Sequence, residues 1–147
     1  MRIIARKVDN QPLTVIVEYP VLDEKARKVL QWVHQLDIQF VGKIDDKLLK
    51  IGLDEIYYFE TVERKVFIYT KEEVFQLQGS ITDVERMMMD SDLVRVSRTC
   101  IINTDHLQEI RQLKNSRLEA TMDNNEKIIV SRKYLREIKN VFRRGTL

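Results

Sequence analysis

The chain has 147 residues, of which 44% are hydrophobic and 33% charged, with a formal net charge of +2. This balance is typical of one globular domain with a short extension, and only four Gly and two Pro argue against disorder. No apolar run approaches the ~20 residues of a membrane span, and the first residues contain no signal-peptide core. A single Cys excludes an intrachain disulfide framework, so we expect a protein of the reducing cytoplasm.

The first third of the chain predicts a small mixed unit. Alternating and β-branched residues between turn residues predict strands at 2–8, 14–19, 39–44 and 47–52. Apolar positions at helical spacing predict a helix at 22–36. Asp23 is suited to cap the helix, and Asp45-Asp46 is suited to a hairpin turn. The one weak boundary lies near this turn, which makes residues 1–45 a ββαβ extension and residues 46–147 the main domain.

The remaining residues predict mostly short strands. β-branched and aromatic runs indicate strands at 56–61, 65–70, 74–77, 93–96, 100–103, 109–113, 117–121 and 127–130. Ser80 and Asp83 resemble a capping box for a helix that ends near Met89, and Ser131 is suited to cap a final helix. The fold class expected is therefore mainly β with α (α+β), with short packed antiparallel sheets and a C-terminal helix.

The basic residues are unevenly distributed. Residues 131–147 hold six Lys or Arg against one acid, and residues 93–104 hold two Arg and no acid. A nearly neutral chain with segregated charge can still present one basic face to a polyanion.

Basic and hydroxyl-bearing residues also cluster beside buried strands. Arg and Lys can bind phosphates or guanine edges, while Ser, Thr and helix N-terminal amides can bind phosphate oxygens. For any single Arg the commoner role is an ion pair on a solvated surface. The candidate DNA-binding residues are Lys65, Arg95, Ser97, Arg98, Thr99, Ser131, Arg132 and Lys133.

Catalysis is not indicated. The chain has no glycine-rich phosphate loop, no nucleophile elbow and no cluster of metal ligands. His34 and His106 are expected at the surface, and Cys100 is expected to be a buried small hydrophobe. Trp32 and Met87–Met89 are expected in the core or in a dimer contact. We therefore expect no enzyme, no metal, no cofactor and no small-molecule substrate, and an enzyme acting on nucleic acid has the least support.

Four motifs resemble the LytTR family of DNA-binding domains over about residues 46–147. They are Asp54–Glu60, Gly79-Ser80-Ile81, Leu93–Asn103 and Val130–Leu135, in the order and spacing of the family. In the third motif Ser97 replaces the usual His and Cys100 replaces an aromatic. These departures affect the expected DNA sequence preference more than the fold.

The resemblance implies a bacterial transcription regulator that inserts loops, rather than a recognition helix, into successive major grooves of double-stranded DNA. The corresponding loops lie near Lys65, near Arg98 and near Arg132-Lys133. Arg95 is expected either to contact phosphate or to be structural. Asn103 is expected to be a structural turn residue.

The extension is too short for the receiver domain of many LytTR regulators. The resemblance is to short members that lack a receiver, some of which are found beside small membrane proteins thought to restrain them, so a regulatory membrane protein is one expected partner. The apolar stripe of the helix at 22–36 must pack on its own domain or on a second copy, and we favour a homodimer. The alternative function is a protein-interaction or adaptor module that uses the same fold and the extension.

Overall fold

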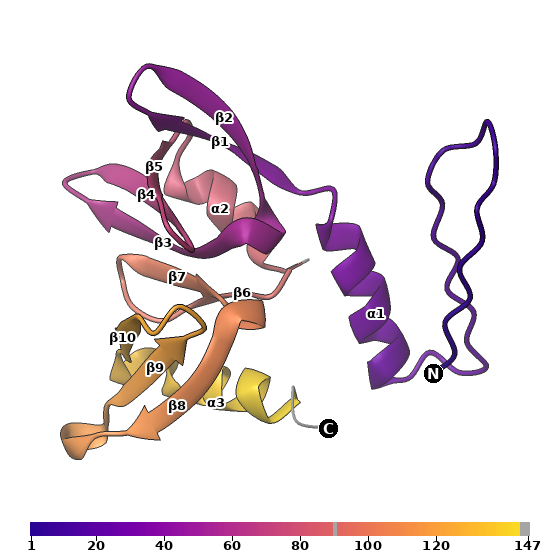
Figure 1. Cartoon of the computed structure of the whole chain (residues 1–147). Helices are drawn as coiled ribbons and strands as arrows, with labels where there is room; N and C mark the ends of the chain where they lie inside the picture. The colour runs from indigo at the N-terminus through magenta and orange to yellow at the C-terminus, as the bar shows by residue number, and fades with distance from the viewer. Residues whose placement is uncertain (90, 145–147) are drawn as a thin grey trace.

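The computed structural model describes residues 1–89 and 91–144 and consists of two antiparallel sheets with helices around them (Figure 1). The helices are α1 (Glu24–Gln35), α2 (Ile81–Met88) and α3 (Leu135–Arg144). Residues 145–147, the end of the predicted main domain, lie outside the described residues. No helix in the described part of the chain is long and apolar enough to cross a membrane.

Seven strands form the larger sheet in the order β2-β1-β5-β4-β3-β7-β6, and three form the smaller one in the order β10-β9-β8. Their bounds are β1 Gln39–Ile44, β2 Lys47–Gly52, β3 Ile56–Val62, β4 Lys65–Thr70, β5 Val74–Leu77, β6 Leu93–Arg95, β7 Cys100–Asn103, β8 Leu107–Gln112, β9 Leu118–Met122 and β10 Lys127–Val130. The predicted α+β class with short antiparallel sheets is confirmed.

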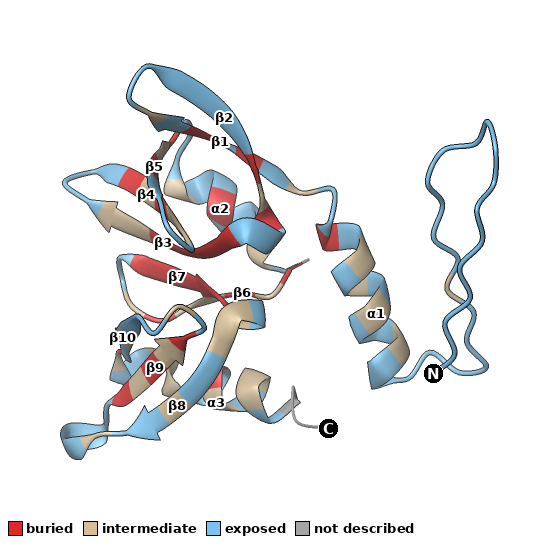
Figure 2. Ribbon diagram, viewed as in Figure 1, coloured by how far each residue is buried: buried red, intermediate tan, exposed pale blue. Residues whose placement is uncertain are grey.

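The larger sheet is buried on both faces at β3 and β7. Ile101 packs into a core with α2, whereas its neighbours Cys100 and Ile102 pack into a second core with the smaller sheet and α3. Val84 of α2 and Ile138 of α3 are fully buried in these cores. Burial on both faces explains why the sequence of β7 is apolar without alternation (Figure 2).

Two helix-capping predictions are confirmed. Asp23 accepts a hydrogen bond from the Ala26 N–H at 2.8 Å and begins α1. At the start of α2, the Ser80 N–H donates to the Asp83 carboxylate at 2.8 Å, and this hydrogen bond lowers the pKa of Asp83.

The N-terminal strand predictions are wrong. Residues 2–8 and 14–19 form two limbs joined by the expected turn, with Asn10 at a φ of 58°, but neither limb is a strand. A strand needs a neighbour for its ladder hydrogen bonds, and no limb pairs with a strand of the described chain. The strand at 39–44 does form, but β1 pairs with β2 and β5 of the larger sheet. Residues 1–45 therefore contain α1 and β1 without the two expected strands before them, and the predicted boundary near residue 45 lies at the turn of the β1–β2 hairpin.

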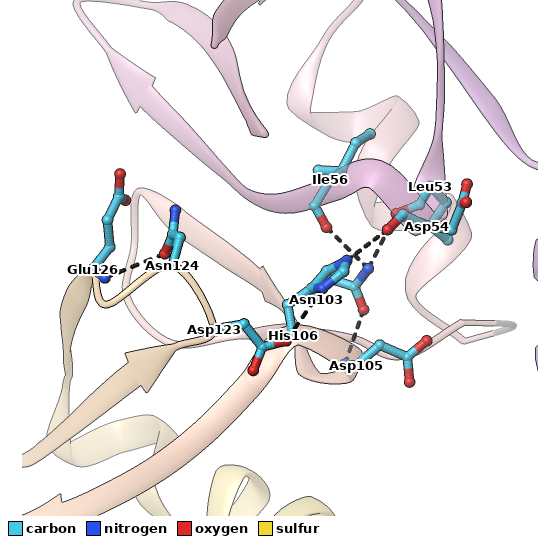
Figure 3. A network of polar contacts seen from close by, with 9 residues as sticks. All are labelled: Leu53, Asp54, Ile56, Asn103, Asp105, His106, Asp123, Asn124 and Glu126. Carbon is cyan, nitrogen blue, oxygen red and sulfur yellow. Dashed lines mark hydrogen bonds and ion pairs between the residues drawn. The ribbon is translucent and has the colours of Figure 1, made fainter. Parts of the chain in front are cut away.

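Asn103 joins the parts of the domain where β7 ends (Figure 3). Its buried amide donates to the backbone oxygens of Leu53 at 3.1 Å and Ile56 at 3.0 Å, and its Oδ1 accepts from the Asp105 N–H at 3.1 Å. The structural role expected for Asn103 is thus confirmed.

His106 makes a second link beside Asn103. Its Nε2 lies 2.6 Å from the Asp54 backbone oxygen, its Nδ1 lies 3.6 Å from Asp123 Oδ2, and its ring stacks on Tyr57 with centroids 4.1 Å apart. These contacts join the start of β3 to the β9–β10 turn, so they hold the two sheets together.

We expect Asn103→Ala to destabilise the domain by about 2–4 kcal/mol, because it leaves two buried carbonyl oxygens without donors. Urea unfolding followed by circular dichroism measures this change. The control is Asn140→Ala on the exposed side of α3, for which about 0.5 kcal/mol or less is expected. Equal losses for the two variants would contradict the role given to Asn103.

Candidate nucleic-acid interface

Three loops that are distant in sequence meet at one side of the domain, on the left in Figure 1. The Thr61 N–H, near the end of β3, donates to the Thr99 backbone oxygen at 2.8 Å. The Ser131 N–H, after β10, donates to the Val96 backbone oxygen at 2.8 Å. The β6–β7 loop is therefore bonded to the β3–β4 hairpin on one side and to the start of the C-terminal helical segment on the other.

The first loop is the β3–β4 turn. Glu63 and Arg64 have φ values of 50° and 69°, a conformation suited to a tight two-residue hairpin. This turn exposes Arg64 at its tip and Lys65 at the start of β4, opposite Val62. Glu63 places one acid among these basic side chains.

The second loop connects β6 to β7 and has an internal hydrogen-bond network. The Arg95 guanidinium donates to the backbone oxygens of Arg98 at 2.9 Å and Ser97 at 3.3 Å, and it pairs with Glu85 of α2 at 2.5 Å. Ser97 Oγ accepts from the Thr99 N–H at 3.2 Å. Arg98 and Thr99 are exposed, whereas the Arg95 side chain is only 17% exposed.

The third loop runs from Ser131 to Lys133 and forms a 3-10 turn before α3. Ser131 is the N-cap residue of this turn, as predicted, and its backbone oxygen accepts from the Tyr134 N–H, although its hydroxyl makes no capping hydrogen bond. Arg132 and Lys133 are exposed. Arg132 Nε donates to the Asn115 backbone oxygen at 3.1 Å, and Lys133 Nζ lies 5.7 Å from the centre of the Tyr134 ring.

The Arg132–Asn115 bond brings a fourth basic segment to this side of the domain. Lys114 and Arg117, which flank the β8–β9 turn, are exposed. Sequence reasoning identified the turn but not its basic neighbours. The sequence signal for this segment was the pair of basic residues, Lys114 and Arg117, that flanks Asn115-Ser116. The pattern alone does not show that the pairing of β10 with β9 brings this turn to Arg132.

Cys100 lies beneath the β6–β7 loop, and its thiol is unsuited to act as a nucleophile. Its side chain is buried, and burial raises the pKa of the thiol to about 12. Tyr58 stacks on Tyr69 nearby, with centroids 4.2 Å apart, and donates to Glu126 Oε2. The residues beneath the loops are therefore closely packed and hydrogen-bonded. Within the described residues no group of His, Cys, Asp and Glu is arranged to hold a metal ion.

Exposed basic side chains gathered at one side of a β-rich domain are typical of a domain that binds nucleic acid. The profile of the LytTr DNA-binding domain family matches residues 46–143, and the chain belongs to this family. The solved structure of a LytTr DNA-binding domain from Bacillus cereus superposes with a TM-score of 0.64 at 23% identity, covering 71% of this chain and 95% of that one. The family resemblance and the fold expected from the sequence are confirmed.

Curated relatives include regulators that are longer than this chain. The chain is 28% identical over 119 residues to the sensory transduction protein LytT of Bacillus anthracis, an alignment covering 81% of this chain and 47% of that protein. It is 26% identical over 95 residues to LytT of Enterococcus faecalis, covering 65% of this chain and 39% of that protein. The chain thus spans less than half the length of these LytT proteins. An HTH-type transcriptional regulator of Staphylococcus aureus is 21% identical over 84% of both chains.

The contacts of Arg95 predict a positioning role in DNA binding. We expect Arg95→Ala to weaken binding by loosening the β6–β7 loop, while the salt dependence of binding stays unchanged because no phosphate contact is lost. Salt titrations of the wild type and the variant measure this, and amide exchange at residues 97–99 should increase in the variant. A log–log salt slope that becomes shallower by about one unit would instead assign Arg95 to a phosphate.

Proposed function

We propose that the protein is a sequence-specific, DNA-binding transcription regulator that reads double-stranded DNA through three loops and acts as a dimer. The observation that carries the proposal is a backbone hydrogen bond between the loop that presents Arg98 and the loop that presents Lys133. Because Ser131 is bonded to Val96, these two exposed basic side chains are held on adjoining backbone segments. Loops supported in this way are suited to enter successive major grooves.

The loop geometry divides the candidate residues by role. Arg98 and Lys133 are exposed at loop positions and are assigned to base edges. Lys65, Thr99 and Arg132 are assigned to phosphates. Ser131 is assigned to phosphate through its hydroxyl, since its N–H is bonded within the protein.

Arg95 and Ser97 are assigned to holding the β6–β7 loop rather than to direct contact. The Arg95 guanidinium donates to carbonyl oxygens of the loop, and the Ser97 hydroxyl accepts from the loop backbone. Neither α2 nor α3 is assigned as a recognition helix, since each packs a fully buried residue, Val84 or Ile138, into a core.

A dimer fits this function, because two linked modules gain affinity when they engage two half-sites of a repeated sequence. Because a regulator of this kind acts on the bacterial chromosome, it would work in the cytoplasm. A regulatory membrane protein that covers the N-terminal segment is a further partner that this arrangement allows. The exposed apolar residues of that segment also favour the second candidate function, an adaptor module that binds another protein.

We expect the purified protein to shift duplex DNA, with log K falling against log salt at a slope near −0.9 per phosphate, for roughly four to eight phosphates. Fluorescence anisotropy at several salt concentrations measures the slope. Genomic fragments retained by the protein, once sequenced, supply the specific site. A flat salt dependence, or no binding at low salt, would exclude the DNA-binding proposal and leave the adaptor function.

Arg98→Ala and Lys133→Ala are each expected to cost about 1–3 kcal/mol on the best site and less on random DNA, because they remove base contacts. Arg132→Ala should weaken binding to both DNAs about equally. Lys50→Ala, on the exposed edge strand β2 away from the loops, is the matched control and should bind like the wild type. If Arg98→Ala lost its fold instead, by circular dichroism, Arg98 would be reassigned to a structural contact.

A further inference from the structure

Residues 1–22, which we call the arm, are almost entirely exposed (Figure 2) and include many large apolar side chains. Ten of its large apolar side chains are at least 39% exposed, and Leu13, Ile3 and Ile16 are 97%, 81% and 77% exposed. Removing large apolar side chains from water is favourable, so an arm left in solvent gains none of the stabilisation that its burial would give. Contiguous apolar surface of this kind marks an interaction site.

The arm has the pattern of a strand that lacks a partner. Leu13, Val15, Val17 and Tyr19 alternate with Thr14, Ile16 and Glu18, so one face of an extended chain would be wholly apolar. The first limb is basic, with Arg2, Arg6 and Lys7. Two strands alone are marginal in water and need further strands or a helix to become stable.

Helix α1 turns its apolar face away from its own domain. Its polar residues Glu24, Arg27, Lys28 and Gln31 line an open cleft, facing Asp92 and Asp105 of the domain. These positions recur at helical spacing on one face, whereas Ala26, Val29, Leu30 and Val33 lie on the opposite face. A helix that packs on its own domain would show the reverse orientation.

The end of α1 is fixed, so the arm is held at a distance from the domain. Gln35 Nε2 donates to Asp92 Oδ2 at 3.2 Å, the Asp92 N–H donates to Gln35 Oε1 at 3.4 Å, and the Leu53 N–H donates to the Ile38 backbone oxygen at 2.9 Å. From this anchor the 12 residues of α1 extend about 18 Å. The arm at its far end lies on the opposite side of the molecule from the DNA loops (Figure 1).

We propose that the arm is a dimerisation element that pairs as β-strands with the arm of a second copy, and that the apolar faces of the two α1 helices cover the resulting four-stranded sheet. Two arms provide the additional strands that one lacks, and two helices provide the layer that buries the sheet. The inference rests on the dimeric part of the proposed function and names the surface that makes the dimer.

Charge and apolar surface both favour a second copy as the occupant. The basic first limb of one copy is complementary to the second limb of the other, which carries Glu18, whereas like limbs would repel at the first limb. Because the side chains of a strand alternate between two faces, about half of these apolar side chains can lie on the covered face. The apolar residues Val29, Leu30 and Val33 of α1 add to the surface that a second copy would bury.

The test compares two substitutions at adjacent positions of the full chain. Val15→Asp places a charge on the apolar face of the proposed strand, and Thr14→Asp places the same charge on the other face. Sedimentation velocity at micromolar concentration should show a dimer for the wild type and Thr14→Asp. It should show a monomer for Val15→Asp, with its dimer dissociation constant raised roughly tenfold or more. Amide protection of β3 and β7 should remain that of the wild type in both variants, since the arm belongs to neither core.

Hydrogen exchange gives an independent measurement on the wild type. Amides of residues 2–8 and 14–19 should be protected in the dimer and should lose this protection in Val15→Asp. A monomeric wild type with unprotected limbs would overturn the proposal and leave the surface to another protein. A dimeric Val15→Asp, or a monomeric Thr14→Asp, would overturn the assignment of the interface to this face of the arm.

The outcome for the arm can be separated from the outcome for DNA binding. Val15→Asp should still bind a probe containing one half-site like the wild type, and Lys133→Ala should remain a dimer while losing specific binding. A wild type that dimerises through the arm but binds no DNA would refute the proposed function alone.

Discussion

The structure depends on the hydrogen bonds of Asn103, at the point where the chain leaves the larger sheet for the smaller one. The Asn103 side chain satisfies two buried carbonyl oxygens before and within β3, and it starts the turn that leads to β8. Its strand, β7, is packed between two cores, so any shift at Asn103 would be transmitted to both. The loops proposed to bind DNA lie at the other end of the same strand, where Thr99 is four residues from Asn103.

In the proposed function, this arrangement allows loops to take the place of a recognition helix. A loop costs conformational entropy when it is fixed on DNA, and that cost is smaller when the loop is already ordered. Here Arg95 uses its guanidinium to hold the backbone of the β6–β7 loop, and backbone hydrogen bonds from Thr61 and Ser131 fix both neighbouring loops to it. The exposed side chains therefore project from a backbone that the fold has already set.

Local pattern predicted most of the fold, because most strands here have neighbours that the chain itself supplies. The hairpin of β1 and β2 forms at the predicted residues, and the capping residues of α1 and α2 hold. The limbs at 2–8 and 14–19 have an equally good strand pattern but pair with no strand among the described residues, and pattern alone cannot reveal whether a partner exists. Tertiary packing decides that Arg95 points into its own loop and that the turn at Lys114 lies beside Arg132. The sequence could therefore identify basic residues but could not tell those that hold a loop from those free to contact DNA.

The arm and the loops proposed to bind DNA are separate surfaces, so DNA binding can be regulated through the arm. Because the two surfaces lie on opposite sides of the domain, a protein that occupied the arm would not touch the DNA loops. It would nevertheless weaken binding to a repeated site, since affinity for two half-sites depends on the link between two modules and not on either module alone. Binding to a single half-site would be unaffected. In the proposed dimer, DNA binding can thus be controlled through the dimer contact, with no change of conformation required in the DNA-binding domain.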